Sequence, residues 1–433
     1  MNSRNSGIRG MTLIEMMVAT TASLILLGIV AQLFGILGRG VSNNTNTQAL
    51  NDRMRSVTHV LRRDLEGITV KTLPPAKSAE DCGYLEIIEG PITDGTVNAN
   101  SINGDCDDFI LFTSRNLAKP FIGKFSGTSH FESQTAEIAW YCRPGSSQPH
   151  ATATPPSTLY NLYRRQLLAV AFVGAAPFTT GNNSMPWPGS WTAFFNDYDV
   201  SCRKEGTVLY PNSLGDLTKR ENRFLHDSTF PHAFPPTSAS DLVLSGSSRE
   251  GDDIVLTNVV AFDVRVYDPT APQRTVGNVA VSPGDLGFAS GTLNGAVGAY
   301  VDLNWDKSLT SAISGTASFP ASGQTAFQGR GVSYRAGMTP ASMTNATYDT
   351  WSTHYEFNGV NDGDGPGIPA GSIDEGTNGV DDNGDGLVDD IAELETSAPY
   401  PTPLRGLEIR IRCYEPSSRQ IRQITVRHTF VPH

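Results

Sequence analysis

The stretch that decides the fold runs from Arg9 to Ala19 and reads RGMTLIEMMVA. It leads into a run from Met16 to Gly38 that contains no charged residue. A helix over these 23 residues is about 35 Å long at 1.5 Å per residue, enough to cross a hydrocarbon layer of about 30 Å. The sequence therefore predicts one transmembrane helix over about residues 13–38, with Glu15 near its beginning.

The charges around this run predict its orientation. Arg4 and Arg9 precede it, so the positive-inside rule keeps the amino terminus in the cytoplasm and places the chain after Arg39 outside. A cleaved secretory signal fits poorly, because the apolar run is long and no small-residue cleavage site follows it. A plain single-pass anchor explains the length but supplies no partner for the carboxylate of Glu15.

The segment RGMTLIEMMVA resembles the amino-terminal signature of type IV pilins and of the pseudopilins of type II secretion. The resemblance implies that residues 1–10 are a leader peptide, which a membrane-embedded prepilin peptidase removes by cutting after Gly10. Met11 would then be the N-methylated first residue, where most of the family has phenylalanine. Glu15 would be the fifth residue of the mature chain.

Cleavage after Gly10 would give Glu15 a possible ionic partner. The new α-ammonium at Met11 is mostly charged at neutral pH, and either charge alone is costly to bury in a membrane. The resemblance implies that Glu15 meets the amino terminus of a neighbouring subunit, which favours transfer from bilayer to filament. A pair between Glu15 and Met11 of one chain is equally open from the sequence.

The helix is predicted to continue beyond the membrane as far as Gly67. Apolar residues recur at steps of four, three, four and four residues, which is the period of one helical stripe; they are Leu50, Met54, Val57, Leu61 and Leu65. Residues 42–49, SNNTNTQA, have weak helix propensity and predict a kinked or melted junction. The predicted helix therefore spans residues 11–67, with a membrane half and an amphipathic half.

The body, residues 68–433, carries strand signals. Strands are predicted at 84–88, 108–113, 136–142, 159–172, 253–267 and 299–304, and a hairpin with one polar face at 406–430. Its outward arginines, Arg410, Arg412, Arg422 and Arg427, are predicted to be solvated or paired with acids. Gly-, Ser- and Pro-rich insertions at about 173–250 and 270–400 are predicted to be loops. The predicted fold class is α+β: a long pilin-type helix packed on a large antiparallel β domain.

The order of these segments resembles a J-type minor pseudopilin of type II secretion or a W-type minor pilin. The resemblance implies a structural subunit of the inner membrane, with a periplasmic carboxy-terminal domain, that joins other pilin or pseudopilin subunits in a tip or initiation complex. A type IV pilus minor pilin is one alternative. Another is a calcium-dependent tip adhesin that binds through the aromatic tract Trp187, Trp191, Phe194, Phe195 and Tyr198, although core packing also explains that tract.

Two loops rich in aspartate and glycine suggest a calcium-binding site. In NGVDDNGDGLVDD, oxygen-bearing side chains occupy positions 1, 3, 5 and 9 of a calcium loop, with Gly386 at position 6; they are Asp381, Asn383, Asp385 and Asp389. Ala392 replaces the glutamate that an EF-hand needs at position 12. The near copy NGVNDGDG supplies Asp362 and Asp364. The sequence predicts a structural calcium site, and a solvated acidic loop is the alternative.

The cysteines and the charge balance limit other functions. For a body outside the cytoplasm, Cys82–Cys106 and Cys142–Cys202 are plausible disulfides whose connectivity stays open, and Cys413 is predicted to be a free buried thiol. The 32 basic and 44 acidic residues give a net charge of −12, which disfavours binding to nucleic acid. The chain contains no GxSxG, HExxH, P-loop or Rossmann motif, so no enzymatic activity is predicted.

Overall fold

The computed structural model describes residues 11–72, 82–90, 102–125, 129–145, 158–169, 185–219, 222–224, 249–303, 305, 346–351, 379–382, 384–388 and 404–431. The chain forms two compact units. The first consists of residues up to Arg53 together with Glu415–Gln420, and the second of Met54–Tyr414 and the chain from Ile421 onward.

The amino-terminal helix, α1, runs from Leu13 to Glu66 over 54 residues without interruption. It confirms the predicted helix to within two residues at each end. The predicted kink at residues 42–49 is wrong, because the backbone there is helical. The hydroxyl of Thr45 donates to the carbonyl of Val41 one turn earlier, so at least one polar side chain of this tract bonds within the helix.

The first part of α1 is long and apolar enough to span a membrane. Leu13–Gly38 comprises 26 residues, about 39 Å at 1.5 Å per residue, and none of its most apolar stretch is buried within the chain. The hydroxyls of Thr20, Thr21 and Ser23 donate to backbone carbonyls within the preceding turn of the helix. These hydroxyls therefore need no further partner in an apolar environment.

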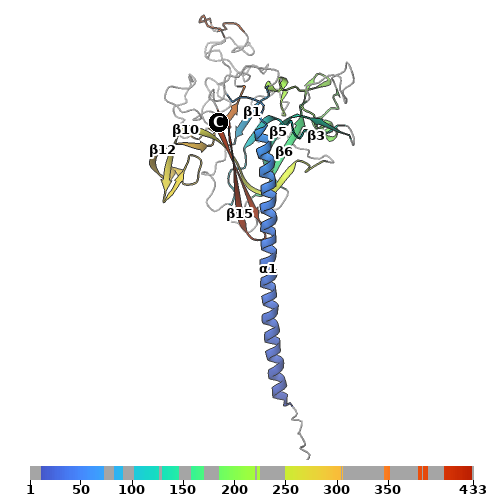
Figure 1. Cartoon of the computed structure of the whole chain (residues 1–433), viewed down its shortest axis with the longest axis vertical. Coiled ribbons are helices and arrows are strands. Elements are labelled where there is room, and N and C mark those ends of the chain that lie inside the picture. Colours follow the sequence, from blue (N-terminus) through green and yellow to red (C-terminus); the bar gives the residue numbers. More distant parts are fainter. Residues whose placement is uncertain are drawn as a thin grey trace, which may run out of the picture. The chain divides into compact units, whose positions relative to one another are not determined.

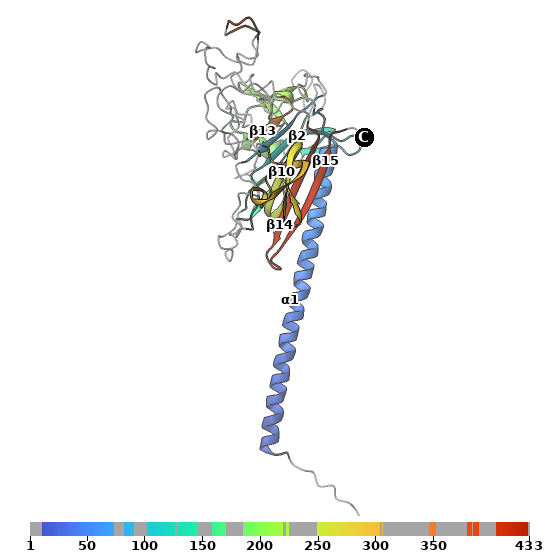
Figure 2. The same ribbon diagram turned by 90° about the vertical axis from the view of Figure 1, so that its left-hand side faces the viewer.

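The second unit is built on an antiparallel ten-stranded sheet (Figures 1 and 2). Its strands are β1 (Leu85–Glu89), β2 (Phe109–Arg115), β5 (Thr135–Pro144), β6 (Tyr160–Leu168), β10 (Ile254–Val276), β11 (Val279–Val281), β12 (Thr292–Val301), β13 (Ala346–Asp349), β14 (Gly406–Glu415) and β15 (Gln420–Thr429). Their order is β13-β1-β2-β5-β6-β10-β14-β15, with β11 and β12 paired to β10. Each predicted strand overlaps an observed one, and the carboxy-terminal hairpin is confirmed.

The amphipathic stripe of α1 is buried as predicted. Leu50, Met54, Val57, Leu61 and Leu65 are 6, 2, 5, 0 and 1% exposed. From Met54 onward the helix belongs to the sheet-containing unit, where its last turns lie beside β5 and β6 (Figure 1). Burying one such apolar side chain stabilises a fold by about 1.5–3 kcal/mol, so the buried residues from Met54 onward stabilise the last turns of α1 within the sheet-containing unit.

Asp64 adds a polar attachment beside this stripe. Its carboxylate is fully buried and accepts two hydrogen bonds from Arg164 on β6, at 2.6 Å from Nε and 2.9 Å from Nη2. The indole nitrogen of Trp140 on β5 donates to the same carboxylate at 3.2 Å. The Ser114 hydroxyl on β2 donates to the Asp64 carbonyl at 2.9 Å. One turn of helix is thus bonded to three neighbouring strands.

Gly67 ends the helix by permitting a close approach to β2. A Cβ atom there would lie 2.6 Å from the Arg115 carbonyl oxygen and 3.1 Å from the Arg115 nitrogen. The Arg115 N–H donates to the Gly67 carbonyl at 2.7 Å. Glycine is therefore required here by backbone packing, since its φ is not among the positive values of this chain.

The two predicted insertions contain regular structure, so their prediction as loops is wrong in part. The first holds β7 (Met185–Pro186), α2 (Trp191–Asp197), β8 (Cys202–Glu205), β9 (Val208–Pro211) and a 3-10 turn, Asp216–Thr218. The second holds the end of β10, a 3-10 turn (Phe288–Ser290), and β11, β12 and β13. Most elements of the insertions are short and lie among turn-forming residues, which hides their periodicity.

Outside the insertions, a separate two-stranded sheet pairs β3 (Phe121–Lys124) with β4 (His130–Ser133).

Candidate functional site

The predicted processing and assembly segment lies at the start of α1. Gly10 is outside the described residues, and Met11 lies two residues before the first helical residue, Leu13. Thr12 and Glu15 form a reciprocal capping box: the Thr12 N–H donates to Glu15 Oε2 at 2.8 Å, and the Glu15 N–H donates to Thr12 Oγ1 at 3.2 Å. The Thr12 hydroxyl also donates to Glu15 Oε2 at 3.1 Å.

The capping box changes the interpretation of Glu15. A plain anchor was expected to leave its carboxylate without a partner, and the structure instead gives it two donors on Thr12. Both donors are neutral, so they stabilise the carboxylate without cancelling its charge. Glu15 can therefore serve helix initiation and ionic pairing, and the two roles are separable by substitution.

The structure describes residues 379–382 and 384–388 of the predicted calcium loop. Asp381 accepts three backbone N–H groups: Oδ1 from Gly384 at 2.7 Å and Asp385 at 3.1 Å, and Oδ2 from Gly386 at 2.8 Å. Gly386 has a φ of 91°, which agrees with the predicted sharp turn. Of the other predicted ligands, Asp385 accepts the Leu387 N–H at 2.8 Å. Asn383, Asp389, Asp362 and Asp364 lie outside the described residues, so calcium binding here stays a prediction.

The predicted disulfides are absent, because all five cysteines are free thiols. Cys202 lies close to Glu137, because the hydroxyl of its neighbour Ser201 donates to the Glu137 carboxylate at 2.7 Å. Cys142 lies five residues farther along β5, so about 16 Å of strand separates it from Glu137 at 3.3 Å per residue. That separation exceeds the Cα distance of about 6 Å that a disulfide spans. Cys142 instead neighbours Cys106 and Cys413, and burial followed by these two thiols raises its pKa. Cys413 is fully buried, as predicted.

Carboxylates gather where β1 ends, where β2 begins and where β12 ends. We call Glu89, Asp105, Asp107, Asp108 and Asp302 the acidic cluster. One carboxylate oxygen from each of Glu89, Asp105 and Asp302 lies within 4.8 Å of the other two, and the same holds for Asp105, Asp107 and Asp108. All except the half-buried Asp107 are at most 3% exposed.

Burial and mutual repulsion dominate the electrostatics of the acidic cluster. Desolvation, followed by repulsion from neighbouring carboxylates, raises the pKa of Glu89 and of Asp105 well above the usual range. The guanidinium of Arg265 faces this region, with its Nε 3.1 Å from an Asp302 oxygen, and Arg410 also lowers the pKa of Asp302 against the larger effect of burial. Arg265 also pairs with Asp263 at 2.9 Å and with Asp285 at 2.6 Å, so its charge is shared among three acids.

The acidic cluster was not predicted from the sequence. Its strongest local signal is DCDDF at residues 105–109, three acids in four residues directly before a buried strand. Glu89 and Asp302 are distant in sequence. The pairing of β1 with β2 and of β10 with β12, together with the hydrogen bond from the Phe262 N–H on β10 to the Asp105 carbonyl, brings them to this place.

Another buried carboxylate, Glu137 on β5, joins several segments. Its oxygens accept hydrogen bonds from the Tyr84 hydroxyl at 2.7 Å, the Ser201 hydroxyl at 2.7 Å and the Phe224 N–H at 3.1 Å. Burial raises the pKa of Glu137 from 4.5 to about 7, although these three donors oppose the shift.

This shift predicts a loss of stability as the pH rises. The unfolded chain releases the Glu137 proton near pH 4.5 and the folded chain near pH 7, so ionisation favours unfolding between these values. The full effect is about 3 kcal/mol, lost as the pH rises from about 4.5 through 7. Glu137→Gln should abolish this part of the dependence, as measured by urea unfolding of both proteins at pH 5 and pH 8. Equal pH dependence in the two proteins would contradict the assignment.

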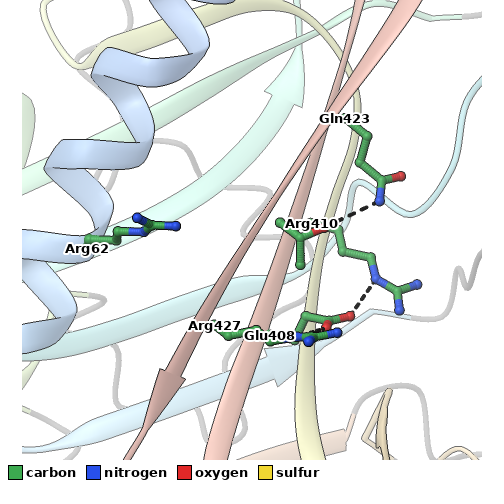
Figure 3. Close-up of a pocket in the computed structure, with 6 residues that line it drawn as sticks. Arg62, Glu408, Arg410, Gln423 and Arg427 are labelled. Carbon is green, nitrogen blue, oxygen red and sulfur yellow. Dashed lines mark hydrogen bonds and ion pairs between the residues drawn. The ribbon is translucent and has the colours of Figure 1, made fainter.

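A polar pocket of about 570 Å³ lies between α1 and the β14–β15 hairpin (Figure 3). It is lined by Arg62, Glu408, Arg410, Gln423, Thr425 and Arg427. Glu408 accepts from Arg410 Nε and from Arg427 Nε, each at 2.6 Å, and Arg410 also pairs with Asp285. The prediction that the hairpin arginines pair with acids is therefore confirmed for Arg410 and Arg427.

The aromatic tract proposed as an adhesive surface packs largely on itself. Phe194 and Phe195 are each 1% exposed. Trp191 stacks on Phe195 at 5.8 Å between ring centroids, and Phe194 stacks on Tyr198 at 5.0 Å. Ser190 caps α2 by accepting the Ala193 N–H at 3.1 Å. The tract thus forms a small local core around α2.

Comparisons with known proteins identify no relative. No protein-family model, curated protein or solved structure matches this chain. Its function is therefore inferred from its own residues.

Proposed function

We propose that this chain is a structural minor pilin or pseudopilin subunit, processed after Gly10 and assembled through α1 into a type II secretion pseudopilus, in a tip or initiation complex. Its partners would be other pilin or pseudopilin subunits and the prepilin peptidase. Before assembly the subunit would reside in the inner membrane, with the sheet-containing unit in the periplasm.

The observation that carries the proposal is the division of α1 into two different halves. Leu13–Gly38 is long and apolar enough to span a membrane and its most apolar stretch is not buried within the chain, whereas Met54–Leu65 buries a stripe of apolar residues within the unit that contains the sheet. A simple anchor needs only the first half. A helix that both spans a membrane and forms part of a folded core suits a subunit that must leave the bilayer with its domain attached.

The alternatives differ in what they require. A type IV pilus minor pilin would use the same processing and the same helix, so it is distinguished by which assembly machinery incorporates the subunit. The tip-adhesin alternative loses its candidate surface, because two of the five aromatic residues are buried and the tract packs on itself. We therefore favour a structural subunit.

Processing gives the most direct test of the proposal. We expect mass spectrometry of the membrane-extracted full-length product to show a chain beginning with N-methylated Met11, because a leader ending at Gly10 is removed on the cytoplasmic side. Gly10→Val is the matched variant, and it should retain the leader. A wild-type chain that keeps residues 1–10 would contradict the proposal.

A further inference from the structure

The acidic cluster contains carboxylate oxygens that the fold leaves without hydrogen bonds. Glu89 is 3% exposed; its Oε2 accepts the Leu303 N–H at 3.1 Å, but its Oε1 has no hydrogen-bond partner. Asp302 is 1% exposed, and neither of its oxygens has a hydrogen-bond partner, although Oδ1 lies 3.1 Å from Arg265 Nε. A buried anionic oxygen without a donor is costly, so this arrangement calls for a positive ligand.

The surrounding backbone holds these carboxylates in place. Asp108 accepts the Gly90 N–H at 3.2 Å and the Val264 N–H at 2.7 Å, which fixes the chain on which Asp105 lies. The Asp302 carboxylate lies against Gly284, where a Cβ atom would come within 2.9 Å of both its oxygens. Gly284 also has a φ of 88°, a conformation that favours glycine. The geometry of the cluster is therefore set by the fold and does not depend on a mobile side chain.

The spacing of the oxygens matches that of ligands on one metal ion. Calcium–oxygen distances of 2.3–2.6 Å allow two ligands of one ion to be about 5 Å apart at most. The oxygens of Glu89, Asp105 and Asp302 satisfy this limit pairwise, at 4.8 Å or less. We propose that Glu89, Asp105 and Asp302 bind a calcium ion, with Asp108 positioning the segment that carries Asp105.

The chemistry of the ligands selects the class of cation. Carboxylate oxygens suit calcium, magnesium or manganese, whereas zinc prefers nitrogen and sulfur ligands. Magnesium usually keeps several of its waters, and this cluster is buried. Calcium accepts irregular coordination by six to eight oxygens, which suits carboxylates from three separate segments. The site is independent of the proposed function and of the predicted loop at Asp381.

Such an ion would join segments that are distant in the chain. Glu89 ends β1, Asp105 precedes β2, and Asp302 directly follows β12. β1 and β2 are adjacent in the sheet, whereas β12 pairs with β10. Calcium would therefore link the end of β12 to the ends of β1 and β2, beside the hydrogen bond that the Phe262 N–H on β10 already donates to the Asp105 carbonyl at 2.6 Å.

The test is calcium binding by the full-length protein in detergent, after removal of metal with EGTA. Asp381→Asn serves as the background, because it removes the charge of the first ligand of the predicted loop and so weakens any binding there. Equilibrium dialysis with radioactive calcium should show one ion per chain in this background. Glu89→Gln, added to it, should weaken binding at least tenfold, and Asp302→Asn should do the same. Magnesium and manganese chloride, titrated in parallel, test the choice of cation.

Thermal unfolding separates loss of a ligand from a failure to fold. Calcium should raise the melting temperature of the Asp381→Asn protein by several degrees, since a ligand that binds only the folded state stabilises it. In EGTA, Glu89→Gln should melt no lower than its parent, because a neutral amide is compatible with the surrounding carboxylates, and it should lose the response to calcium. Absence of bound calcium in the folded Asp381→Asn protein would overturn the proposal, as would undiminished binding in both cluster variants.

Discussion

Replacing Asp64 with alanine should lower the free energy of unfolding of the sheet-containing unit by about 3–5 kcal/mol, the cost of breaking a buried ion pair from one side. The Arg164 side chain is 12% exposed and would lose both of its hydrogen bonds to the carboxylate. The Trp140 indole N–H would lose its acceptor as well. The apolar stripe of α1 would remain, so the loss reports the polar attachment alone.

Urea unfolding of the full-length protein in detergent measures this effect. Glu66→Ala is the matched control, since it removes the same charge from an exposed position two residues farther along the helix and should change stability by less than about 0.5 kcal/mol. Arg164→Met in the Asp64→Ala background should recover part of the loss, because it removes the charge left without a partner. An Asp64→Ala protein within about 1 kcal/mol of wild type would show that the stripe alone attaches the helix.

Replacing Glu15 with glutamine should reduce incorporation into filaments at least tenfold and leave membrane insertion unchanged. The proposed function requires the charge of Glu15 to meet an ammonium in a low-dielectric environment, where the pair is strongly attractive. Glutamine keeps the capping box, since its carbonyl can accept the Thr12 N–H as the carboxylate does. The substitution therefore removes the charge without removing the helix cap.

Thr12→Ala is the complementary variant, because it removes the capping hydroxyl and keeps the charge. It should assemble at close to wild-type yield. Both variants are compared by immunoblotting the membrane fraction and the sheared filament fraction of cells that express each at equal levels. Normal assembly of Glu15→Gln would refute the ionic role. Loss of assembly in Thr12→Ala alone would assign Glu15 to helix capping.

The sequence by itself determined the features that depend on local periodicity. The uncharged run, the stripe from Leu50 to Leu65 and the alternation in GLEIRIRCYE each repeat at the period of their own element, so the helix and the terminal hairpin could be predicted. The polar tract 42–49 was misjudged because propensity is a weak signal, and a helix already formed on both sides of a short segment can extend through it.

Only the tertiary structure decided which distant side chains meet. Asp64 and Arg164 are 100 residues apart, and Glu89 and Leu303 are 214 apart, yet each pair shares a buried hydrogen bond. Strand order sets these contacts, and the length of β5 separates Cys142 from the Glu137 end of that strand, where Cys202 lies. The physical reason is that periodicity records which face of an element is buried, whereas the partner across that face depends on how the strands are ordered in space.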